Sequence, residues 1–215
     1  AAFTYARYDR FEQWLREYEH EAQRLAGQNQ GLHATAIYLR TRWQHWQRDP
    51  DYGPGLVADR MSEVERMFAQ HDPVTPLRAH AAAFGINALL AAGRPEEALE
   101  LADVLVGLER RRPDAPTLLA DALSMRGLVC VRLRRGGPAR ADLDEATTLY
   151  EQHSGREHFL TLQNQVLQGH AWVLDGEPDA GLAHARLAAE GISRKRAGET
   201  KEAMVLTWLG RTELD

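Results

Sequence analysis

The chain has 215 residues, of which 44% are hydrophobic and 27% are charged. These proportions are those of an ordinary globular protein, and they exclude wholesale disorder. No apolar run approaches the roughly 18 residues that a membrane-spanning helix needs. The net charge of -5 gives no electrostatic reason to expect nucleic acid or an anionic membrane as a partner.

Cysteine content and the first residues indicate a cytoplasmic protein. Cys130 is the single cysteine, so an internal disulfide cannot form. Such low cysteine content is typical of the cytoplasm. Residues 1–10 hold aromatics and two arginines but no apolar core, unlike a signal peptide. The chain does not begin with methionine, and we expect a longer parent protein.

The N-terminal segment, 1–75, is predicted to form irregular helical repeats. Apolar residues recur at helical spacing over 11–25, and this helix should end near Gly27. A second helix is expected over about 32–46. After a turn cluster rich in glycine, proline and aspartate over 49–55, a third helix is expected over about 57–70.

The remainder, 76–215, is predicted to consist of helix pairs separated by Gly-x-Pro joints. Glycine can cap the first helix in a left-handed conformation, and proline suits the first turn of the next. The joint glycines recur at nearly equal intervals, at Gly93, Gly136 and Gly176. The expected repeats are 76–112, 115–153, 157–195 and an incomplete 199–215, all continuing one solenoid with the segment 1–75.

A second set of glycines lies in the middle of the first helix of successive pairs. Gly127, Gly169 and Gly210 recur at nearly the same interval as the joints. A glycine inside a helix costs about 1 kcal/mol relative to alanine, so three in register indicate close approach of two helices. The small residues Ala139 and Gly181 are expected to supply the opposing surface.

This pattern resembles the tetratricopeptide-repeat family. The residues that match the family motif are Gly127, Cys130, Ala139 and Ala146 in the second unit, Gly169, Trp172, Gly181 and Ala188 in the third, Leu89, Gly93, Ala98 and Leu105 in the first, and Leu209 and Gly210 in the fourth. The interval between joints is longer than this family's usual repeat length. The longer interval resembles the variety in sensor regions of bacterial transcriptional activators and related signalling proteins.

The resemblance implies an all-α fold, a right-handed superhelical array of about nine to ten helices arranged as antiparallel pairs. The first helix of each pair would line a concave groove. The positions that the family register places in this partner-binding groove are His80, Asn87, Asp121, Ser124, Leu128, Arg132, Gln163, Val166, His170, Thr207 and Arg211. Their mixed polarity suits a peptide segment or a small ligand.

No group of residues in the sequence suggests a catalytic or metal site. Cys130 is expected to be a buried structural thiol, and the nine histidines are scattered. Arginine clusters at 110–112, 132–135 and 194–196 fall at helix C-termini, where cations complement the helix dipole. We therefore expect no enzyme activity, no cofactor and no direct nucleic-acid recognition.

Aromatic residues are concentrated near the N-terminus, where ten of the sixteen lie before residue 53. Two interpretations stay open. They can form a well-packed cap, or they can form an exposed contact surface, because tryptophan and tyrosine concentrate in interface hot spots.

Two hypotheses for function follow. The first is a non-catalytic protein-interaction or regulatory domain of a larger bacterial signalling or transcriptional regulator. The second is a domain that senses a small-molecule or peptide effector in the concave groove. Self-association through the unpaired helix of 199–215 is a further expectation, because large apolar patches rarely stay bare.

Overall fold

The computed structural model describes residues 2–73 and 75–194, and side chains from residue 9 onward. All the regular structure in this part is α-helical, which confirms the predicted fold class. The helices divide into two compact units, 1–94 and 95–215. Within each unit, helices that follow one another in the chain pack against each other, as in a helical solenoid.

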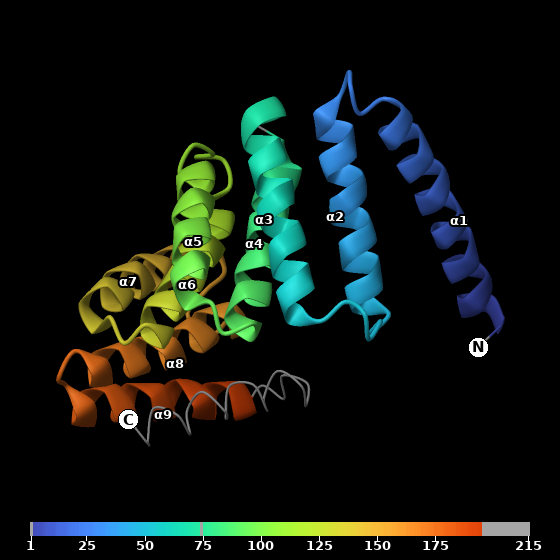
Figure 1. Ribbon diagram of the computed structural model, residues 1–215. Helices are drawn as coiled ribbons and strands as arrows, with labels where there is room; N and C mark the ends of the chain where they lie inside the picture. The colour runs from blue at the N-terminus through green and yellow to red at the C-terminus, as the bar shows by residue number, and fades with distance from the viewer. Residues whose placement is uncertain (1, 74, 195–215) are drawn as a thin grey trace. The chain divides into compact units, whose positions relative to one another are not determined.

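Unit 1 contains α1 (Ala2–Arg24), α2 (Gln30–Trp46), α3 (Pro54–His71) and α4 (Pro76–Ala91) (Figure 1). Proline begins α3 and α4, where its missing N–H costs no hydrogen bond. The side chain of Asn29 caps α2 by accepting a hydrogen bond from the Leu32 N–H at 3.1 Å.

The core of unit 1 follows the apolar face predicted for the third helix. The α3 side chains Val57, Met61, Val64 and Phe68 are all fully buried. Their spacing of three or four residues places them on one face of the helix, where α2 and α4 cover them.

Unit 2 contains α5 (Pro95–Glu109), α6 (Pro116–Arg132), α7 (Gly136–His153), α8 (Phe159–Leu174) and α9 (Pro178–Arg194). One buried cluster joins α6, α7 and α8 and includes Cys130, Leu143 and Leu167. A second joins α8 to α9 through Leu162, Val166, Ala185, Ala188, Ala189 and Ile192. Cys130 is buried, as the sequence predicts.

The close helix contact predicted at Gly169 is present between α8 and α9. A Cβ atom at Gly169 would lie 2.5 Å from the carbonyl oxygen of Gly181 and 2.7 Å from Ala185 Cβ. A Cβ atom at Gly181 would in turn meet the Gly169 carbonyl oxygen. At Gly127 the opposing residue is Leu143, at 2.6 Å, rather than the expected Ala139.

The joints follow the prediction at two sites and differ at the third. Gly93 and Gly176 take left-handed conformations with φ of 73° and 92°. Between α6 and α7 the left-handed residue is Arg134, with φ of 56°, and Gly136 is already the first helical residue. Gly136 is instead placed against the α8–α9 joint, where a Cβ atom would lie 2.7 Å from the Asp175 backbone nitrogen.

The boundary between the two units falls at residues 94 and 95, inside the predicted repeat 76–112, and places α4 in unit 1. A half-buried ion pair joins α4 to α3. Arg78 on α4 donates to Glu65 Oε1 on α3 through Nε at 2.8 Å and Nη2 at 2.6 Å.

Candidate functional site

The predicted groove residues do not all lie on open surface. In unit 1, His80 and Asn87 are exposed on α4, and the Asn87 side chain donates to the Ala83 carbonyl of its own helix at 3.0 Å. In unit 2, Arg132 is exposed, whereas Leu128 and Gln163 are half-buried. Thr207 and Arg211 lie outside the described residues.

Two members of the predicted groove are buried, so their assignment as groove residues is wrong. Val166 is fully buried in the cluster between α8 and α9, because it lies on the face of α8 that Ala185 and Ala189 cover. His170 is also buried, with 8% of its surface exposed. The family register placed both on an open face, but packing of α9 against α8 covers the first of them.

Asp121 and Ser124 on α6 are engaged with α7. The Tyr150 hydroxyl on α7 donates to Asp121 Oδ1 at 2.6 Å. Burial raises the pKa of Asp121, and burial together with the charge of Asp121 raises the pKa of Tyr150. These groups join two helices within the unit, so they contribute to packing rather than to a free binding surface.

Unit 1 carries a continuous row of five aromatic rings, which we call the aromatic strip: Phe11, Trp14 and Tyr18 on α1, and Trp43 and Trp46 on α2. The rings of Phe11 and Trp43 join the two helices with centroids 4.6 Å apart. Trp14 stacks on Tyr18 at 5.4 Å, and Trp43 stacks on Trp46 at 5.3 Å.

Two members of the aromatic strip, one on each helix, are exposed. Trp14 has 47% of its surface accessible and Trp46 has 56%. Alongside them α1 and α2 are fixed by Arg40, which pairs with Glu12 at 2.7 Å and with Glu19 at 2.5 Å. The strip is therefore an open aromatic surface on a braced helix pair, while another N-terminal aromatic, Tyr38, is buried.

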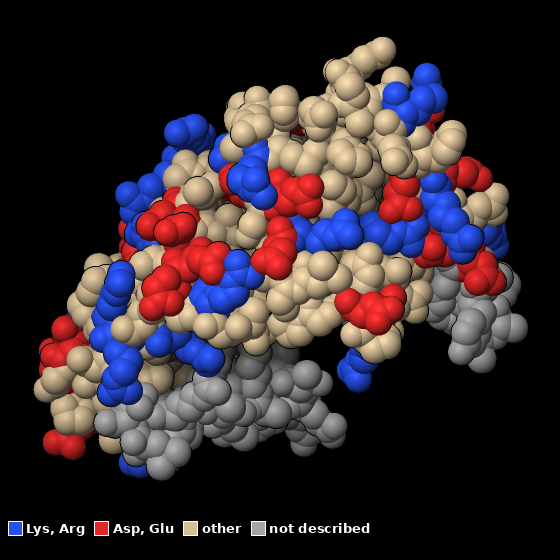
Figure 2. Space-filling view, viewed as in Figure 1, with Lys and Arg blue, Asp and Glu red and all other residues tan. Residues whose placement is uncertain are grey.

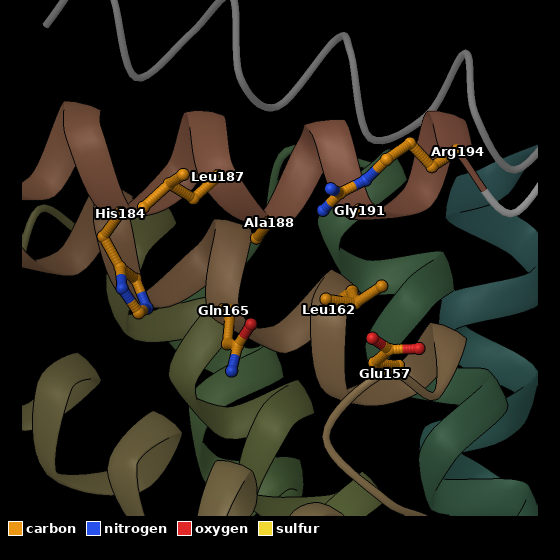
Figure 3. A pocket seen from close by; sticks show the side chains of 8 residues that line it. All are labelled: Glu157, Leu162, Gln165, His184, Leu187, Ala188, Gly191 and Arg194. Atoms are coloured by element: carbon orange, nitrogen blue, oxygen red, sulfur yellow. The ribbon is translucent and has the colours of Figure 1, made fainter.

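Unit 2 holds a pocket of about 500 Å³ between α8 and α9 (Figure 3). Its lining residues are Glu157, Leu162, Gln165, His184, Leu187, Ala188, Gly191 and Arg194. The described members of the predicted groove are not among them. Five of the eight lie at helical spacing along one face of α9. This spacing is the feature of the sequence from which the pocket could have been predicted.

A chain of polar contacts leads from this pocket to α7. His184 on the pocket wall lies with Nε2 3.2 Å from Gln168 Oε1 on α8. Gln168 donates to Asp144 on α7 at 2.5 Å and accepts from the Thr147 hydroxyl at 3.0 Å. Burial lowers the pKa of His184, which favours the neutral form of its imidazole.

His184 also belongs to an aromatic stack around Trp172. The His184 ring stacks on Trp172 with centroids 4.5 Å apart, and the Arg140 guanidinium lies over the same ring at 5.2 Å. Arg140 also donates to Glu177 at 2.6 Å, just before the start of α9. The position of His184 is thus linked to α7, α8 and α9 together.

No group of three histidine, cysteine or carboxylate side chains in the described ranges could hold a metal ion. Burial raises the pKa of the Cys130 thiol, which disfavours the reactive thiolate.

No described helix is long and apolar enough to span a membrane. On the face in Figure 2, basic and acidic side chains are interspersed.

Comparison with known proteins gives a likeness of fold. No family model matches the sequence, and no curated protein matches it. Among solved structures the chain is similar to the crystal structure of BtubC (BKLC) from P. vanneervenii, with a TM-score of 0.64 and 14% sequence identity over 95% of this chain and 82% of that one. At this identity the similarity shows an all-helical fold in common.

Proposed function

We propose that the chain is a non-catalytic protein-interaction domain of a larger bacterial signalling or transcriptional regulator. The observation that carries this proposal is the aromatic strip. Trp14 and Trp46 lie on adjacent helices, contact further aromatic rings and each have about half of their surface accessible. Tryptophan is among the residue types that most often supply binding energy at protein interfaces.

The strip is also rigid enough to serve as a binding surface. The Arg40 bridges hold α1 against α2, and Phe11 fills the space between Trp14 and Trp43. Aromatic side chains have few rotatable bonds, so little conformational entropy is lost when a partner covers them. A partner segment would therefore gain apolar contact on a surface that is already arranged.

The test is to purify the binding partner from the source bacterium on the immobilised chain and to titrate it against variants. Trp14→Ala and Trp46→Ala should each weaken binding at least about 30-fold, the change that corresponds to a hot-spot residue. Leu56→Ala, which removes another exposed apolar side chain of unit 1, is the matched control. Loss of binding in Arg132→Ala with unchanged binding in both tryptophan variants would overturn the strip in favour of the predicted groove.

A second candidate function is effector sensing, and the pocket of unit 2 favours it. Its volume of about 500 Å³ lies within the range of small-molecule sites. The chain from His184 through Gln168 to Asp144 offers a route by which an occupied pocket would alter α7. Calorimetric titration of metabolites against the chain and against Trp14→Ala separates this function from the first, because the two sites lie in different units.

A further inference from the structure

We propose that the pocket between α8 and α9 binds an amphipathic monocarboxylate with an aliphatic chain. This inference rests on the second candidate function and names its ligand class. It uses the apolar and charged residues that line the pocket and does not involve the aromatic strip of unit 1.

The walls of the pocket are apolar where α8 faces α9. Leu162 comes from α8, and Leu187 and Ala188 come from α9 (Figure 3). Leu187 keeps 67% of its surface exposed, so a ligand that covers it removes apolar area from water. Leu162 and Ala188 belong to the buried cluster between the two helices, so Leu187 offers most of the apolar surface that an aliphatic chain would cover.

The charge in the pocket favours an anion. Arg194 at the end of α9 extends its guanidinium back over Gly191 toward the middle of the pocket, as Figure 3 shows. Gly191 itself lies close to α8, because a Cβ atom there would lie 3.1 Å from Leu162 Cδ2. Guanidinium binds a carboxylate through two parallel hydrogen bonds, which fixes the ligand's orientation as well as its charge.

A single negative charge is favoured over two. The Glu157 carboxylate lies at the opposite rim, beyond Leu162 (Figure 3). At the far end of the lining α9 face the pocket offers the Gln165 amide and the His184 imidazole, and no second guanidinium or ammonium group is among the lining residues.

Occupation of the pocket would be communicated to α7 through His184. Its ring lies on the pocket wall, stacks on Trp172 and contacts Gln168, which is bonded to Asp144 and Thr147. A ligand that presses on His184 therefore changes the environment of the Trp172 indole. This provides a spectroscopic signal of binding in the pocket that is separate from the heat of binding.

The experiment titrates octanoate and octan-1-ol against the full chain by calorimetry, with the Trp172 indole N–H followed by NMR. We expect saturable binding of octanoate, at least about tenfold weaker binding of octanol, and a shift of the Trp172 signal. Arg194→Gln should weaken octanoate at least about tenfold and leave octanol unchanged. Arg186→Gln, on the same helix but outside the pocket lining, should change both by less than about twofold.

Leu187→Ser provides a second test that does not depend on charge. It should weaken both ligands by a similar factor, because it removes apolar contact from the chain-binding wall. Equal affinity of octanol and octanoate would overturn the assignment of an anionic ligand. Absence of saturable binding would overturn the pocket as a ligand site and would leave the proposal for the aromatic strip unaffected. Octanoate binding that is lost in Trp14→Ala and retained in Arg194→Gln would also overturn the pocket, and it would place the ligand at the aromatic strip.

Discussion

At the scale of single residues, the absence of a side chain at Gly169 decides how α8 and α9 pack. The backbone of Gly181 and the methyl group of Ala185 occupy the space that a Cβ atom would need. A mid-helix glycine lowers helix propensity, but here it permits two helices to approach closely and to bury Val166 and Ala189 between them. The packing gain compensates for the weaker helix.

Gly169→Ala should destabilise the protein by about 1–3 kcal/mol, because the new methyl group overlaps backbone atoms that cannot move independently. The matched control is Gly107→Ala on α5, where nothing lies within 4 Å of the added atom. That change should stabilise by up to about 1 kcal/mol through helix propensity. Urea unfolding of both variants measures the two effects, and a loss of stability of equal size in both would contradict the close contact.

His184 should make stability depend on pH. Burial lowers its pKa in the folded state, despite the opposing effect of Asp144. Its contribution to stability is therefore fully present above the unfolded pKa of about 6.5 and is lost as the pH falls through the folded value. His184→Asn should show a shallower decline of unfolding free energy between pH 7 and pH 5 than the parent. Parallel declines in urea titrations of the two proteins would show that the imidazole is not neutralised by folding.

At the scale of helices, the sequence predicts the joints well and the roles of their glycines less well. Gly-x-Pro identified where helices end and begin because left-handed glycine and first-turn proline have strong local preferences. It could not distinguish Gly136, which is needed for close packing against Asp175, from a capping glycine. That distinction depends on the joint between α8 and α9, which comes one whole helix pair later in the chain.

The candidate sites, like the joints, could be predicted only in part from local sequence. The clustering of aromatics indicated a cap or a contact surface in the N-terminal helices, but only packing determines that Trp14 is exposed and Tyr38 is buried. The groove assignment failed at Val166 because it relied on a family register, whereas the amount of α8 that α9 covers depends on small residues at Gly181 and Ala185. The pocket could not be predicted because its lining residues form no recognisable sequence motif. They form a site only because α8 and α9 pack side by side.

Substitution of adjacent glycines tests the role of Gly136. A Cβ atom at Gly136 would lie 2.7 Å from the Asp175 nitrogen, whereas one at Gly137 would meet only Asp175 Oδ1 at 3.7 Å. Gly136→Ala should therefore cost about 1–3 kcal/mol, and Gly137→Ala should be neutral or stabilising. Thermal unfolding of the two variants provides the comparison. Similar stabilities would place the constraint in helix capping rather than in packing against the α8–α9 joint.

At the scale of the whole molecule, stability is distributed among contacts between neighbouring helices. In unit 2, Arg126 of α6 donates two hydrogen bonds to Asp142 of α7, at 2.7 and 2.6 Å, and a third to Asp103 of α5 at 2.9 Å. In unit 1, Arg40 and Arg78 make comparable links between α1 and α2 and between α3 and α4. Such nearest-neighbour coupling is typical of helical arrays, in which stability is roughly a sum over adjacent elements.

This organisation predicts that a local defect has a local effect. Gly169→Ala should accelerate amide exchange most in α8 and α9, less in α7, which packs on α8, and not in α2 and α3 of unit 1. Hydrogen exchange followed by mass spectrometry resolves these helices, and Gly107→Ala serves as the unperturbed reference. Acceleration of the same size in α2, α3, α8 and α9 would show that the chain unfolds in a single cooperative step. Because the aromatic strip and the pocket lie in different units, confined exchange would also mean that substitutions at one site can be interpreted without a folding defect at the other.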